Sequence, residues 1–96
     1  MDRDILKHAR TRIDEIDRNI VQLLKDREAE VREIAEYKAI YNLPIEQPER
    51  EKELLEKVRD ISKLGEMDEQ YIQDIFKCII TRSRAFQGEV INKKLG

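Results

Sequence analysis

The stretch DILKHARTRIDEIDRNIVQLLKDREAEVREIAEYKAIY, residues 4–41, contains neither Gly nor Pro. Its apolar residues recur every three or four positions, which predicts one continuous helix. Such a helix would be about 57 Å long, whereas a compact chain of 96 residues has a radius of gyration of roughly 12–13 Å. A short chain cannot cover so long a helix, so we expect a second protomer. The residues of the predicted apolar stripe are Leu6, Ala9, Ile13, Ile16, Ile20, Leu23, Ile34 and Tyr41.

Two further helices are predicted beyond this stretch. Asn42-Leu43-Pro44 ends the first helix, because a residue before proline is pushed out of the helical region and Asn suits a helix C-terminus. Pro48 suits a first helical position, and Gly65 ends the second helix. Asp68 is the expected N-cap of the third, and residues 92–96 are expected to fray. The predicted fold class is therefore all-α, with three helices in one domain over residues 1–96.

The composition narrows the function. Charged residues make up 42% of the chain, against roughly 25% in an average protein, and Gly and Pro together number only five. The net charge of −2 does not indicate a nucleic-acid binder. No apolar run is long enough for a membrane span, and the N-terminus does not resemble a signal peptide. We expect a soluble, cytoplasmic protein.

The chain has one cysteine, Cys78, and one histidine, His8. These counts exclude an internal disulfide, a cysteine-based zinc site and a histidine ligand cluster. Cys78 lies among apolar residues of the third helix and is expected in the core as a small hydrophobic residue.

Several polar residues stand where the helical stripes call for apolar ones. Burying such groups without partners costs several kcal/mol, and more if they are charged. They therefore need matching partners. These residues are Arg27 and Lys38 on the first helix, Glu51 on the second, and Ser83 and Gln87 on the third.

Three interpretations of these residues stay open on spacing alone. They can pair with one another, Arg27 with Glu51 and Lys38 with another carboxylate, or the long side chains can extend to the surface. Alternatively, the surplus of cations forms a pocket for a small polyanion such as a dicarboxylate. Arg10 lies about 25 Å before Arg27 along the helix. It could reach the same molecule only from an antiparallel partner helix.

The sequence resembles the all-helical class of chorismate mutases from about Ala9 to Gln87. No single one of the matching segments is specific to this family. Their order and their spacing in a chain of this size are specific to it. The segments that carry the resemblance are RTRIDEID at 10–17, LLKDR at 23–27, YK at 37–38, PIEQPERE at 44–51, and then Ser83 and Gln87.

The resemblance implies an intertwined homodimer whose long first helices pair antiparallel. Each of two active sites would be built by one protomer plus Arg10 donated by the other. The implied activity is that of an isomerase, the Claisen rearrangement of chorismate to prephenate in phenylalanine and tyrosine biosynthesis. It implies no cofactor or metal, because a unimolecular pericyclic step needs no activated nucleophile.

The resemblance also implies a role for each site residue. Arg10, Arg27 and Arg50 would bind the two carboxylates of the substrate, since a guanidinium fork fits a carboxylate. Lys38 and Gln87 would be the catalytic donors to the ether oxygen, on which negative charge grows as the carbon–oxygen bond breaks.

The remaining assignments concern the ring of the substrate. Glu51 would accept a hydrogen bond from the ring hydroxyl, and Ser83 would line the ring side. Gln47 departs from the family, because enteric members have an aspartate there; we expect altered substrate contact rather than lost activity. Gln87 stands where some fungal relatives carry a glutamate that must be protonated, so we expect no collapse of kcat between about pH 6 and pH 8.

Two competing functions remain. One is an isochorismate pyruvate lyase on the same scaffold, against which the acid at Glu51 argues. The other is a non-catalytic helical dimerisation module in which the charged residues on the helix faces only form interhelical salt bridges.

Overall fold

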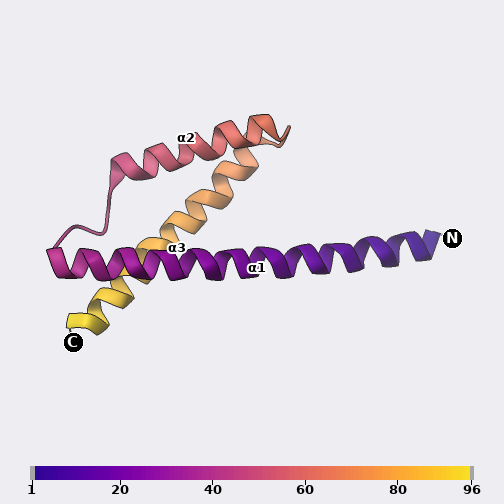
Figure 1. The fold of residues 1–96 in the computed structure, drawn as a ribbon. Coiled ribbons are helices and arrows are strands. Elements are labelled where there is room, and N and C mark those ends of the chain that lie inside the picture. Colours follow the sequence, from indigo (N-terminus) through magenta and orange to yellow (C-terminus); the bar gives the residue numbers. More distant parts are fainter. Residues whose placement is uncertain (1, 96) are drawn as a thin grey trace. The chain divides into compact units, whose positions relative to one another are not determined.

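The computed structural model describes residues 2–95, which form three α-helices and contain no strand (Figure 1). Helix α1 spans Asp2–Tyr41, α2 spans Pro48–Leu64 and α3 spans Glu69–Leu95. The prediction of an all-α fold with three helices is confirmed. The chain divides into two compact units, residues 1–30 and residues 31–96.

The first unit consists of the N-terminal part of α1. Its apolar stripe is at the surface: Leu6, Ile13, Ile16 and Ile20 are between 49% and 55% exposed. A single amphipathic helix has no second element on which to bury such a stripe. Contiguous apolar surface of this kind is typical of an interaction face.

The second unit is built from the last part of α1 together with α2 and α3. Val31 and Ala35 of α1 are buried against Phe86 and Val90 of α3, with the half-buried Ile91 beside them. In both helices the two core residues lie four positions apart, and hence on one face. This small core fixes the C-terminal end of α1 on α3.

Helices α2 and α3 lie side by side as a hairpin (Figure 1). Val58 and Ile80 are buried within this unit. A hydrogen bond of 2.8 Å from Gln73 Nε2 to the Leu55 carbonyl links the two helices. The hairpin therefore holds the first turns of α2 at a defined place beside α3.

The predicted helix ends are confirmed by local contacts. Asn42 adopts the left-handed conformation, with φ of 53°, just after α1. Gly65 follows the last residue of α2 and donates its N–H to the Ile61 carbonyl at 3.0 Å. The Asp68 carboxylate accepts the Tyr71 N–H at 2.9 Å, as an N-cap does.

Two expectations are wrong. Residues 92–95 do not fray, because α3 continues to Leu95; Gly96 lies outside the described residues. Cys78 is exposed rather than in the core. It lies two positions after Phe76, about 200° around the helix, and so faces away from the side of α3 that buries Ile80. None of the described helices combines the length and apolar character that crossing a membrane requires.

Candidate functional site

Lys38 and Gln87 form the centre of the candidate site. Lys38 follows Ala35 by three positions, so the packing of α1 on α3 turns it toward the third helix. Its side chain is buried, and Nζ donates to Gln87 Oε1 at 2.8 Å and to the Ile45 carbonyl at 2.8 Å. Both acceptors are neutral oxygens. The interpretations in which Lys38 extends to solvent or pairs with a carboxylate are therefore wrong.

This contact determines which groups of the pair can serve a ligand. A lysine ammonium has three protons, and two of them are directed at Ile45 and Gln87. Because Gln87 accepts through Oε1, its amide Nε2 is the donor side of the group. The pair thus keeps one ammonium proton and the amide N–H groups for other acceptors.

Burial and a nearby carboxylate act in opposite directions on the pKa of Lys38. Desolvation lowers the pKa of Lys38, and the negative charge of Glu51 partly restores it. Burial disfavours the charged ammonium and a nearby carboxylate favours it. The side chain of Lys38 accordingly lies within the electrostatic influence of one acid of the same site, Glu51.

Glu51, in the first turn of α2, is bound by a residue that the sequence pattern did not single out. Arg84 of α3 donates Nε to Glu51 Oε2 at 2.9 Å and Nη2 to Glu51 Oε1. The Arg84 hydrogen bonds hold the pKa of the Glu51 carboxyl below its usual range; burial opposes this, and the charges of Arg84 and Lys38 add to it. Arg84 lies three positions before Gln87, so helical spacing could have placed it on the face that carries that residue.

The other predicted residues of the second unit are closer to solvent. Arg50 forms an exposed pair with Glu53, Nη1 to Oε1 at 3.2 Å. Gln47 is the N-cap residue of α2, but its Nε2 donates to the Pro44 carbonyl at 3.2 Å instead of its side chain capping the helix. Ser83 is half-buried on α3, one turn before Gln87, and takes part in contacts of its own.

Arg10 and Arg27 belong to the first unit. Arg10 is exposed on α1, whereas Arg27 is half-buried and engaged in contacts. The second unit therefore joins Lys38 directly to Gln87 and brings Glu51 within electrostatic reach of Lys38. The direct partner of Glu51 there is Arg84.

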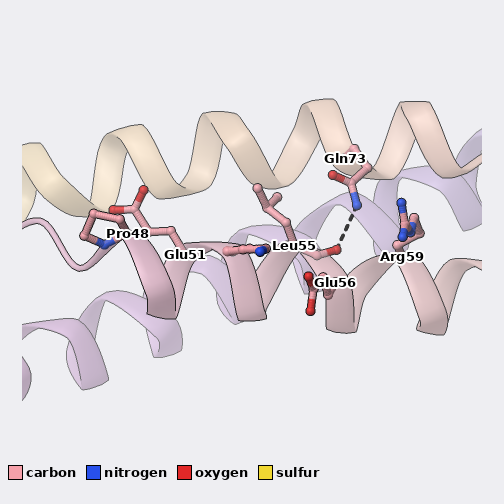
Figure 2. A pocket seen from close by; sticks show the side chains of 7 residues that line it. Pro48, Glu51, Leu55, Glu56, Arg59 and Gln73 are labelled. Carbon is pink, nitrogen blue, oxygen red and sulfur yellow. Dashed lines mark hydrogen bonds between the residues drawn. The ribbon is translucent and has the colours of Figure 1, made fainter.

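An open groove of about 370 Å³ lies between α2 and α3 (Figure 2). Of the predicted site residues it includes only Glu51, at the end nearest Pro48. Gln73 points across it to the Leu55 carbonyl. The groove thus borders the candidate site on the side of Glu51. The described residues hold no group of three or more His, Cys, Asp or Glu side chains arranged for a metal ion. The residues that line the groove between α2 and α3 are Pro48, Glu51, Lys52, Leu55, Glu56, Arg59 and Gln73.

Comparison with known proteins identifies the scaffold. The family model described as chorismate mutase type II matches residues 9–88. The chain is 33% identical over 88 residues to a chorismate mutase of Methanocaldococcus jannaschii, covering 92% of this chain and 89% of that protein.

Longer proteins match as well. The chain is 44% identical over 84 residues to a bifunctional chorismate mutase/prephenate dehydratase of Buchnera aphidicola, covering 88% of this chain and 22% of that protein. It is 34% identical over 94 residues to a protein of the same description from Aquifex aeolicus, covering 95% of this chain and 26% of that one. The chain thus spans about a quarter or less of these bifunctional relatives.

Proposed function

Because this chain belongs to the chorismate mutase type II family, we propose that it is an isomerase that converts chorismate to prephenate. The observation that carries the proposal is the buried contact of 2.8 Å between Lys38 Nζ and Gln87 Oε1. Apolar residues of similar volume in place of buried charged groups are often neutral or stabilising, so folding alone does not call for this pair.

The two donors suit the chemistry of the rearrangement. As the carbon–oxygen bond of the substrate breaks, negative charge grows on the ether oxygen, and no proton has to be transferred. The remaining ammonium proton of Lys38 and the amide N–H of Gln87 stabilise that charge, as the donors of an oxyanion hole do. Preorganised donors of this kind lower the barrier because they bind the transition state more strongly than the substrate.

The substrate must also be held in a compact conformer with its reacting carbons close together, which is a problem of orientation. In this proposal Arg27 and Arg50 bind its two carboxylates together with the partner subunit's Arg10. Glu51 accepts a hydrogen bond from the ring hydroxyl, with Gln47 nearby in the chain, and Ser83 lines the ring side.

A homodimer is part of the proposal. Ile13 and Ile20 of the first unit are about half exposed, and Leu64 of the second unit is 88% exposed. Burying apolar surface contributes roughly 25 cal/mol per Å², and a small domain buries a smaller share of its surface by itself than a large one does. Antiparallel pairing of two α1 helices would cover Ile13 and Ile20 and bring Arg10 to the site of the other protomer.

The decisive experiment follows the decay of chorismate absorbance with wild type and Lys38→Ala. Wild type accelerates the decay over buffer, and Lys38→Ala loses about 100–1,000-fold in kcat, the usual effect of removing such a donor. Lys57→Ala is the matched control, because Lys57 forms an exposed pair with Glu53 on α2 and its removal leaves kcat unchanged. Both variants must retain the helical circular dichroism of wild type.

Two outcomes would overturn the proposal. If wild type does not accelerate chorismate decay but releases pyruvate from isochorismate, the chain is a lyase on the same scaffold. If it acts on neither substrate and chorismate does not raise its melting temperature, the charged residues on the helices serve only to join helices through salt bridges.

A further inference from the structure

We propose that Arg84 is a positioning residue that holds the Glu51 carboxylate and so prevents it from pairing with Lys38. This inference rests on the proposed function for its catalytic consequence. It concerns a residue that the family resemblance did not mark and that contacts Glu51 directly. The effect is to keep the Lys38 ammonium directed at Gln87 and at the ether oxygen of the substrate.

The contact between Arg84 and Glu51 has the geometry of a clamp. Two guanidinium nitrogens, Nε and Nη2, donate to the two different oxygens of the carboxylate. A planar fork of this kind fixes the orientation of the carboxylate as well as its position. It also links α3 to the first turn of α2, across 33 positions of sequence. The Glu51 side chain is 21% exposed and that of Arg84 is 41% exposed, so solvent only partly screens the pair.

Lys38 is the other cation that acts on this carboxylate. Glu51 and Lys38 each favour the charged form of the other, yet Lys38 Nζ donates to the neutral oxygens of Ile45 and Gln87. A full negative charge near an ammonium would ordinarily attract it more strongly than a neutral amide does. The Arg84 clamp explains why Lys38 keeps its neutral acceptors.

Removing the clamp has two expected effects on the site. The freed Glu51 carboxylate draws Lys38 toward itself, which takes the ammonium from the ether oxygen and lowers kcat. The Glu51 carboxylate also loses its fixed orientation toward the ring hydroxyl of the substrate, which raises KM. Both effects need the negative charge of Glu51, so both disappear when Glu51 is replaced by the neutral Gln.

A double-mutant cycle in activity tests this dependence. Arg84→Gln lowers kcat about tenfold in the wild-type background and less than about twofold in the Glu51→Gln background, a difference within the usual range for residues in contact. Arg84→Lys retains the charge but loses the fork, and recovers part of the lost kcat. A loss that is equal in both backgrounds would overturn the inference, since Arg84 would then act on the substrate or on the fold directly.

The matched control is Lys63→Gln. Lys63 of α2 pairs with Glu69 of α3 at 3.6 Å, with side chains 61% and 41% exposed, so this variant also removes an ion pair between the same two helices. Its kcat stays within about twofold of wild type, as expected for an exposed pair. A tenfold loss here would mean that any contact between α2 and α3 sets the activity.

Urea unfolding gives a second readout that does not depend on turnover. The coupling between Lys38 and Glu51 is measured with Lys38→Met and Glu51→Gln, alone and combined, with and without Arg84→Gln. We expect the favourable coupling between Lys38 and Glu51 to lower the unfolding equilibrium constant by about fivefold more when Arg84 is absent than when it is present. An unchanged coupling would overturn the inference even in a chain that has no mutase activity, whereas an inactive wild type with increased coupling would overturn only the proposed function.

Discussion

Lys38 Nζ and Gln87 Oε1 lie 2.8 Å apart, although 49 positions of sequence separate the two residues. Both side chains are buried. The hydrogen bond orients each group for the other, because the lysine fixes which end of the amide remains a donor. A buried pair that keeps donors available suits the proposed role of stabilising charge on the ether oxygen.

The assignment of the Gln87 amide as a donor predicts how kcat depends on pH. An amide needs no protonation to donate, so kcat of wild type stays level between about pH 6 and pH 8. Gln87→Glu introduces a carboxylate that donates only when protonated, and its kcat falls steadily as pH rises over this interval. The measurement is chorismate decay at saturating substrate across the pH series. A steep loss in wild type would contradict the assignment of Gln87 as the donor.

The lowered pKa of Lys38 predicts an alkaline limit for the proposed reaction. Because burial lowers its pKa below the usual 10.5, the ammonium is lost before an exposed lysine would lose its proton. We expect kcat to fall with an apparent pKa below 10.5 on the alkaline side. Removing the Glu51 charge with Glu51→Gln, which takes away the interaction that raises this pKa, moves the fall to lower pH. If the alkaline fall in kcat lies at the same pH in Glu51→Gln as in wild type, the electrostatic coupling between Glu51 and Lys38 would be contradicted.

The same shift predicts how stability depends on pH. Between the lowered pKa in the folded chain and 10.5 in the unfolded chain, the unfolded state binds more protons, so the contribution of Lys38 to the free energy of unfolding rises with pH. Lys38→Met lacks this contribution. The difference between wild type and Lys38→Met in urea unfolding should therefore shift in favour of wild type as pH rises through this interval. A constant difference would show that Lys38 titrates as an exposed lysine does.

The proposed dimer predicts complementation between two inactive variants. Arg10→Ala removes the group that each protomer donates, and Lys38→Ala removes a group that each protomer keeps for its own site. Unfolding and refolding them together yields about a quarter of wild-type activity, because half of the randomly formed dimers are mixed and each mixed dimer has one intact site. Each variant refolded alone stays inactive. No recovery on mixing, with dimers verified by light scattering, would contradict donation of Arg10 across the interface.

The burial of Phe86 predicts how much the free energy of unfolding falls when its side chain is removed from the small core of the second unit. It is buried against Val31, Ala35 and Val90, and its ring faces the guanidinium of Arg32 at 5.0 Å. Phe86→Ala lowers the free energy of unfolding by about 3–5 kcal/mol, as large-to-small changes in a core do. Lys77→Ala, at an exposed position of α3, changes it by less than about 0.5 kcal/mol. Urea unfolding measures both, and a loss below about 1 kcal/mol in Phe86→Ala would mean that this core contributes little.

The helices could be predicted because their signals are local. A proline such as Pro48, a glycine such as Gly65 and a cap such as Asp68 act on their own turn, and the apolar period of 3.6 residues shows which face is buried. Lys38 and Gln87 were found for the same reason, as polar interruptions of an apolar stripe. Cys78 was misplaced because its apolar neighbours in sequence lie on another side of the helix.

The sequence by itself determined which residues form helices and which polar groups stand on their buried faces, because both follow from contacts within one or two turns. Only the tertiary structure decided the partners of those groups: Arg84 for Glu51, and Gln87 with the Ile45 carbonyl for Lys38. In a chain that is 42% charged, Arg84 has many acids it could pair with, and helical periodicity ranks none of them. The packing of α2 and of the end of α1 against α3 brings one acid and one lysine close enough for hydrogen bonds, whose strength falls steeply with distance.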